Sequence, residues 1–123
     1  MAYHVTTDEF EEIVQATLDR VEAPLRARMD ADNLMIIVQQ GPSQDDRANG
    51  IDERVLGFFQ GTSGSTFSAY EFPKRIVLLQ GNIERWCDNR TELVAQISDT
   101  VLHEIAHYFG MDHRDIGQTR LRH

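Results

Sequence analysis

HEIAHYFGMDH, residues 103–113, lies near the C-terminal end of the 123-residue sequence. His103 and His107 are four residues apart, and Glu104 directly follows the first histidine. On an α-helix, residues i and i+4 lie one turn apart on the same face, so both imidazoles can reach one metal ion. Glu104 is rotated by about 100° from His103, so it can reach a water molecule bound to that metal without sharing the row of ligands.

Two further residues extend this pattern. Gly110 can adopt a positive φ without steric cost, so it can end the helix and turn the chain back. After that turn, His113 can offer a third nitrogen to the same metal. A bare HExxH arises by chance in surface helices, but here five positions agree with the extended spacing HExxHxxGxxH of zinc peptidases.

The helix that carries the pattern is predicted to run from about Asn89 to Phe109, with Asn89 and Glu92 spaced as an N-terminal cap pair. Projection at 100° per residue separates an apolar side from a polar side. We expect the apolar side to pack on a sheet and the polar side to face a cleft. The apolar side holds Val94, Ile97, Val101, Ile105 and Phe109, and the polar side holds Gln96, Asp99, Thr100, His103 and His107.

The sequence before this helix predicts one N-terminal helix and several short strands. Thr6 and Glu9 form a capping-box signature for a helix over about Thr7–Glu22, and Pro24 either stops it or opens a short second turn through Met29. Residues 34–38 (LMIIV) predict a central strand, and residues 41–50 (GPSQDDRANG) predict a polar loop. Further strands are expected at Val55–Gln60, Thr66–Tyr70 and Arg75–Leu79, followed by a brief helical piece at Ile83–Cys87.

These elements predict an α+β fold in a single domain over residues 1–123: an N-terminal helix, a small mixed β-sheet of three or four strands, and a C-terminal helix that carries the site. The formal net charge of −8 argues against binding to a nucleic-acid backbone. The longest apolar run, 34–38, is too short to span a membrane, and the N-terminus shows no signal peptide. A lone cysteine, Cys87, favours a reducing, cytoplasmic location.

The expected cofactor is Zn²⁺, because a catalytic zinc site keeps three protein ligands and leaves the fourth position for water. With His103, His107 and His113 as ligands, Glu104 is the expected general base that takes a proton as the metal-activated water attacks a peptide carbonyl. Asp99, one turn before His103, is either a group that orients a ligand imidazole or a solvated helix carboxylate. Candidates for an oxyanion donor are Tyr3, His4 and Tyr70.

Residues 103–113 resemble the metzincin signature, but that clan carries a methionine turn after the third histidine, and no methionine occurs in residues 114–123. Most of the chain more closely resembles the small bacterial zincin-like metallopeptidases, often called minimal metalloproteases. The resemblance runs through LMIIVQQGP, LGFFQG, PKRIVLLQ, IERWC and TVLHEIAHYFGMDH, in that order.

This resemblance implies zinc ligands at His103 and His107, a general base at Glu104, a shallow cleft and peptidase-like chemistry. The third-ligand position of the family falls on His113, where an acidic residue is expected in many relatives. Asp112 and Asp115 are therefore possible substitutes.

The first functional hypothesis is a zinc-dependent peptidase that hydrolyses short peptides or an extended protein segment, with no nucleic-acid or membrane partner. The second is a non-catalytic zinc-binding domain that regulates or binds a partner's peptide. A third is a structural zinc site closed by Asp115 or Cys87. Oligomeric state is left open.

Overall fold

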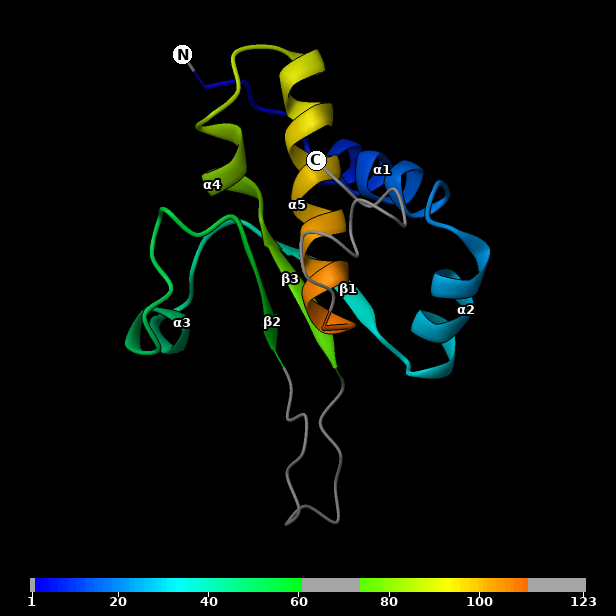
Figure 1. The fold of residues 1–123 in the computed structure, drawn as a ribbon. Helices are drawn as coiled ribbons and strands as arrows, with labels where there is room; N and C mark the ends of the chain where they lie inside the picture. The colour runs from blue at the N-terminus through cyan, green and yellow to red at the C-terminus, as the bar shows by residue number, and fades with distance from the viewer. Residues whose placement is uncertain (1, 61–73, 111–123) are drawn as a thin grey trace.

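The computed structural model describes residues 2–60 and 74–110, which form helices on a small sheet (Figure 1). In Figure 1 the long helix α5 lies in front of the strands, and α1 and α2 lie to its right. In chain order the elements are α1 (Thr7–Leu18), α2 (Ala23–Ala31), β1 (Met35–Gln39), α3 (Gln44–Ala48), β2 (Gly57–Gln60), β3 (Arg75–Leu79), α4 (Gln80–Glu84) and α5 (Arg90–Tyr108).

The strands that the structure describes form one mixed sheet in the order β1-β3-β2. Strand β3 pairs in parallel with β1 and antiparallel with β2. This arrangement confirms the α+β class with an N-terminal helix, a mixed sheet and a C-terminal site helix. The strand expected at Thr66–Tyr70 falls outside the described residues.

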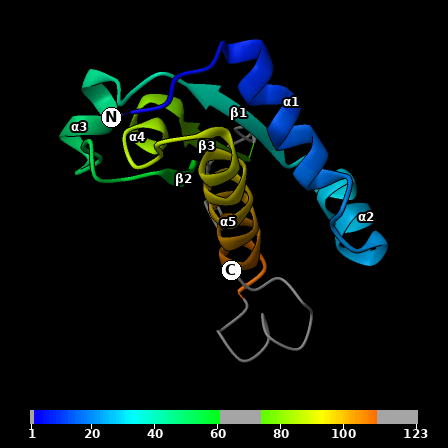
Figure 2. The ribbon, with the colours of Figure 1, turned by 90° about the horizontal axis from the view of Figure 1, so that it is seen from above.

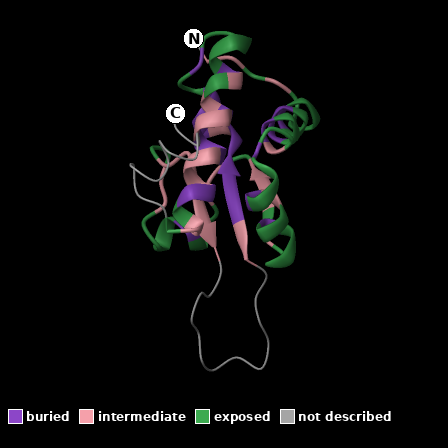
Figure 3. Ribbon diagram, turned by 45° about the vertical axis from the view of Figure 1, so that its right-hand side comes forward, coloured by how far each residue is buried: buried purple, intermediate pink, exposed green. Residues whose placement is uncertain are grey.

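The expectation that residues 34–38 form the central strand is wrong, because β3 occupies the centre and β1 lies at an edge. The four residues Ile76 to Leu79 of β3 are fully buried, whereas β1 is half-buried and exposes Met35. A continuous apolar run is typical of a strand covered on both faces. Both strands carry such a run, and only the tertiary pairing separates them. Figure 3 shows β3 as the buried strand between less buried neighbours.

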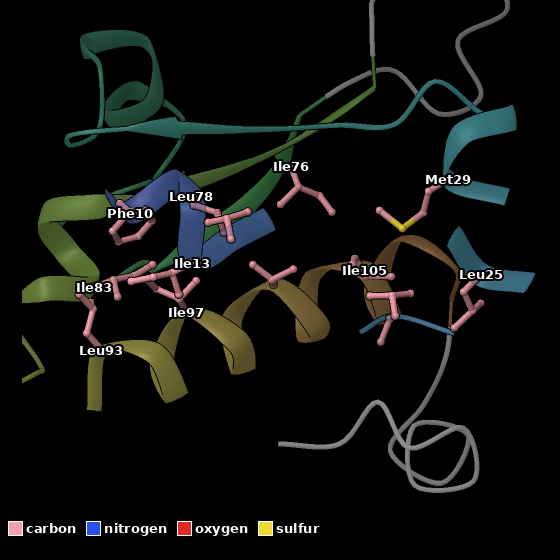
Figure 4. Packing of buried hydrophobic residues seen from close by; sticks show 14 of the residues in the cluster. Phe10, Ile13, Leu25, Met29, Ile76, Leu78, Ile83, Leu93, Ile97 and Ile105 are labelled. Atoms are coloured by element: carbon pink, nitrogen blue, oxygen red, sulfur yellow. The ribbon is translucent and has the colours of Figure 1, made fainter. Parts of the chain in front are cut away.

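The hydrophobic core lies between α5 and the sheet (Figure 4). Ile76 and Leu78 of β3 point toward Ile97 and Ile105 of α5, and Phe10 and Ile13 enter the same layer from α1. Viewed from above, α1 and α5 lie on the same side of the sheet (Figure 2). Burial of this apolar face holds α5 against the strands and leaves its opposite side available for chemistry.

The N-terminal helix begins as expected, with the Thr6 side chain accepting a hydrogen bond from the Glu9 N–H at 3.1 Å. It ends at Leu18, earlier than the expected Glu22, because a tight turn separates α1 from α2. Pro24 lies in the first turn of α2, where its missing N–H has no helical partner to lose. Of the two alternatives for Pro24, the opening of a second helix is therefore confirmed.

The expected polar loop at 41–50 contains the short helix α3. Ser43 and Asp46 form a reciprocal capping box at its start, and Asp46 is buried. The pKa of Asp46 is lowered, first by the backbone N–H of Ser43 and then by the Gln39 side chain, which donates to it at 2.8 Å. Aspartate stands here where glutamate or glutamine usually completes the box, so the sequence signal for a helix was weak.

The helical piece expected at Ile83–Cys87 begins earlier, as α4 directly after β3. Glu84 is buried at its end and accepts hydrogen bonds from the Val5 N–H and the Gln80 side chain, each at 3.0 Å. The bond from Val5 joins the N-terminal segment to the last residue of α4. Among the described residues, no helix is both long and apolar enough to cross a membrane.

Candidate metal centre

Helix α5 carries the candidate site and has nearly the boundaries expected from the sequence. The Asn89 side chain caps it by accepting from the Glu92 N–H at 2.9 Å. Its last residue is Tyr108, and Gly110 adopts φ +71°, so the left-handed glycine expected after the helix is present. The chain therefore leaves the helix at the position that the motif requires for a return toward His107.

The first two histidines of the motif lie side by side on α5. The ring centroids of His103 and His107 are 4.2 Å apart, with 52° between the ring planes. His103 is half-buried and His107 is exposed. His113, Asp112 and Asp115 lie outside the described residues, and no group of three metal-binding side chains occurs within 2–60 and 74–110. The structure thus describes two of the three expected ligands.

A hollow of about 410 Å³ lies beside His103 and Glu104. One wall is the polar side of α5 and the other is the segment that leads into β2. Asp99, expected on the same side as His103, borders this hollow. The described lining residues are Val55, Leu56, Gly57, Gln96, Asp99, Thr100, His103 and Glu104.

Glu104 is half-buried in the wall of this hollow, and burial raises the pKa of its carboxyl group to about 7. Desolvation disfavours the charged form of a carboxylate. Carboxyl groups with a pKa near neutrality are typical of sites for general acid–base chemistry. The position next to His103 also agrees with a group that stands beside the row of ligands.

The two walls are in close contact at Gly57. A Cβ at this position would lie 3.1 Å from Thr100 Cγ2 and 3.2 Å from the Val77 carbonyl oxygen. Glycine therefore lets β2 pack directly on α5. Thr100, expected on the open polar side of α5, is buried by this contact.

We expect Gly57→Val to destabilise the fold by about 1–3 kcal/mol, because the added methyl groups have no space between β2 and α5. Urea denaturation followed by circular dichroism measures this loss. Gly41→Val is a suitable control, since a Cβ at Gly41 meets nothing within 4 Å. An unchanged unfolding midpoint for Gly57→Val would contradict the close packing of β2 on α5.

Tyr108, the residue after His107, is a contact that sequence reasoning missed. Its ring stacks on Phe59 of β2 with centroids 5.4 Å apart, and its hydroxyl donates to Asp32 Oδ2 at 2.8 Å. Arg28 of α2 lies over the neighbouring Phe109 ring at 4.7 Å. These contacts hold the last turn of α5 between β2 and α2. The only sequence signal was the pair of aromatic residues beside His107.

Other residues singled out from the sequence lie far from His103. The Tyr3 N–H donates to the Cys87 carbonyl, and His4 Nδ1 lies 3.0 Å from Glu84 Oε1. Both contacts are near the start of α5, about 20 Å along the helix from His103 at 1.5 Å per residue. Tyr3 and His4 are therefore wrong as oxyanion candidates, and Tyr70 lies outside the described residues.

Cys87 is also too distant to serve as a fourth ligand beside His103. It is 1% exposed, and its thiol donates to the Ile83 carbonyl at 3.4 Å. Burial raises the pKa of the thiol, which disfavours the thiolate that a metal needs. The alternative of a structural site closed by Cys87 is therefore wrong.

A family model for zincin-like metallopeptidases matches residues 31–122. The chain belongs to the zincin-like metallopeptidase family. The match runs from the end of α2 through the whole HExxHxxGxxH pattern. Membership in the zincin-like family implies a metal, usually zinc, and peptide substrates. Comparison with curated proteins gives no match.

Proposed function

We propose that this zincin-like chain is a zinc-dependent peptidase in which His103, His107 and His113 hold the metal and Glu104 is the general base. The observation that supports this most strongly is the pair of imidazoles 4.2 Å apart, next to a half-buried carboxyl group at the wall of a hollow. A family model of metallopeptidases that covers the same residues supports the assignment.

The described donors fit zinc. Neutral imidazole is a preferred zinc ligand, and two histidines at i and i+4 on one helical face are a common way to hold it. His113 would complete three protein ligands and leave one position open. When bound there, zinc would supply Lewis acidity toward the peptide carbonyl and lower the pKa of water toward about 7.

Glu104 would transfer the proton of the attacking water. Its carboxylate accepts a proton from the attacking water and then delivers it to the nitrogen of the leaving amine. This role needs a carboxyl group close to the ligands that does not bind the metal itself. Glu104 agrees with both requirements, because it is adjacent to His103 in sequence but rotated away from the row that His103 shares with His107.

An extended peptide can dock at the edge of β2 that faces away from β3. The Leu79 N–H donates to the Leu56 carbonyl, so the alternate residues Gly57 and Phe59 direct their N–H and C=O groups to the other edge. No described strand pairs with that edge. A substrate segment can add there by main-chain hydrogen bonds, beside the hollow that Gly57 lines.

The test is removal and return of the metal. We expect the purified chain to cleave a mixed peptide library with zinc bound, to lose cleavage after treatment with a chelator, and to recover it when one equivalent of zinc is added. Mass spectrometry of the products measures the cleavage. A chain that binds zinc and peptides without cutting any would instead support the non-catalytic, peptide-binding alternative.

A further inference from the structure

The hollow beside His103 contains one acidic side chain that the proposed reaction does not use. Gln96 and Thr100 hydrogen-bond to each other. The Thr100 hydroxyl donates to the Gln96 backbone carbonyl at 2.8 Å, and the side-chain amide of Gln96 donates to that hydroxyl at 3.3 Å. Asp99 is half-buried in the same wall, and its carboxylate forms no hydrogen bond or ion pair with any described residue. The Asp99 carboxylate can therefore bind a positively charged group of a ligand.

The opposite wall of the hollow is apolar at Val55 and Leu56. Long basic side chains combine an aliphatic stem, which packs on apolar surface, with a cationic end that seeks a carboxylate. Asp99 lies one turn before His103, about 6 Å along the helix axis. The four-carbon stem of lysine is of similar length. A residue bound with its main chain at His103 and Glu104 can thus bring its charged end to Asp99.

We propose that Asp99 is a specificity-determining residue that makes this hollow a pocket for a lysine or arginine side chain next to the scissile bond. This rests on the proposed function, because it assigns the substrate class of the same site. The formal charge of −8 also favours the approach of basic peptides. An acidic side chain in the pocket would lie close to both Asp99 and Glu104. Repulsion between like charges therefore disfavours a substrate with glutamate at the position that enters the pocket.

The experiment uses a peptide series in which lysine, glutamine or glutamate occupies each position flanking the scissile bond in turn. We expect the zinc-loaded wild type to cleave the lysine peptide about 10–100-fold more efficiently than the glutamine peptide at one position, the range that a charge-assisted hydrogen bond supplies. Asp99→Asn should remove this preference, so that the lysine and glutamine peptides are cleaved with similar kcat/KM. Asp99→Lys should favour the glutamate peptide.

Asp30→Asn is the matched control, since Asp30 lies on α2 with a side chain 75% exposed. It should retain the wild-type preference. If the wild type shows no preference for lysine, or if Asp99→Asn leaves that preference intact, the proposal is wrong. Equal losses for all three peptides together with weaker zinc binding would also overturn it, because they would make Asp99 a group that orients a ligand imidazole.

Peptide affinities of the Glu104→Gln variant separate this proposal from the proposed function. Fluorescence anisotropy with labelled peptides requires no cleavage, so a basic preference that Asp99→Asn abolishes supports the pocket even in a chain that does not hydrolyse. A wild type that binds lysine peptides selectively but never cuts them would contradict only the peptidase. Indiscriminate binding in an active peptidase would contradict only the pocket.

Discussion

Glu104→Gln is expected to reduce kcat/KM for peptide hydrolysis by about 10²–10⁴-fold, the usual contribution of general acid–base catalysis. Glutamine has nearly the same size and shape as glutamate, but its amide cannot accept the proton of the attacking water. Because Glu104 is not proposed as a ligand, the zinc content should stay at the wild-type value. Single-peptide kinetics and elemental analysis of the same preparation measure the two quantities.

The control for this variant is Glu12→Gln, an exposed carboxylate on α1. It should leave both turnover and zinc content unchanged. Turnover by Glu104→Gln within about threefold of the wild type would remove Glu104 from the mechanism. Loss of zinc from Glu104→Gln would instead make the carboxylate a ligand.

The second large effect is expected at the ligands. His107→Ala should weaken zinc binding by more than about 100-fold, since even the loss of a residue that only supports a ligand costs about 10–100-fold. His113→Ala should do the same if His113 is the third ligand. Competition with a chromophoric chelator measures both affinities, and circular dichroism checks whether the variants are folded.

Variants of the neighbouring acidic residues test which side chain is the third zinc ligand. Asp112→Asn and Asp115→Asn keep the size of each side chain and remove its charge. His4→Ala removes a histidine of the N-terminal segment that contacts Glu84 of α4. We expect all three to bind zinc normally. Undiminished affinity in His113→Ala, with a loss in one of the aspartate variants, would give the third position to that aspartate.

Local signals in the sequence were sufficient to predict α5. The Asn89 cap, the helical spacing of Ile97, Val101 and Ile105, and the left-handed Gly110 all act within a few residues, and each appears in the structure as expected. The adjacency of His103 and His107 follows from the same geometry. The helix that carries the candidate ligands could therefore be predicted without any tertiary contact.

Features that depend on distant residues could not be predicted. The order β1-β3-β2 is a property of strand pairing, and two similar apolar runs gave no basis for choosing the central one. The contact between Tyr108 and Asp32 joins residues 76 apart in the chain. The hollow likewise lies between α5 and the segment around Gly57, which is more than 40 residues earlier in the chain, so Asp99 could not be recognised as part of a pocket from its position on α5 alone.

X-ray absorption at the zinc K-edge of the metal-loaded chain tests the central claim most directly. The account predicts a four-coordinate zinc with three imidazole nitrogens at about 2.0–2.1 Å and one oxygen from water. The spectrum should keep all three imidazoles in Glu104→Gln and lose one in His107→Ala. Zinc surrounded by four protein ligands, or no specifically bound zinc at all, would contradict it.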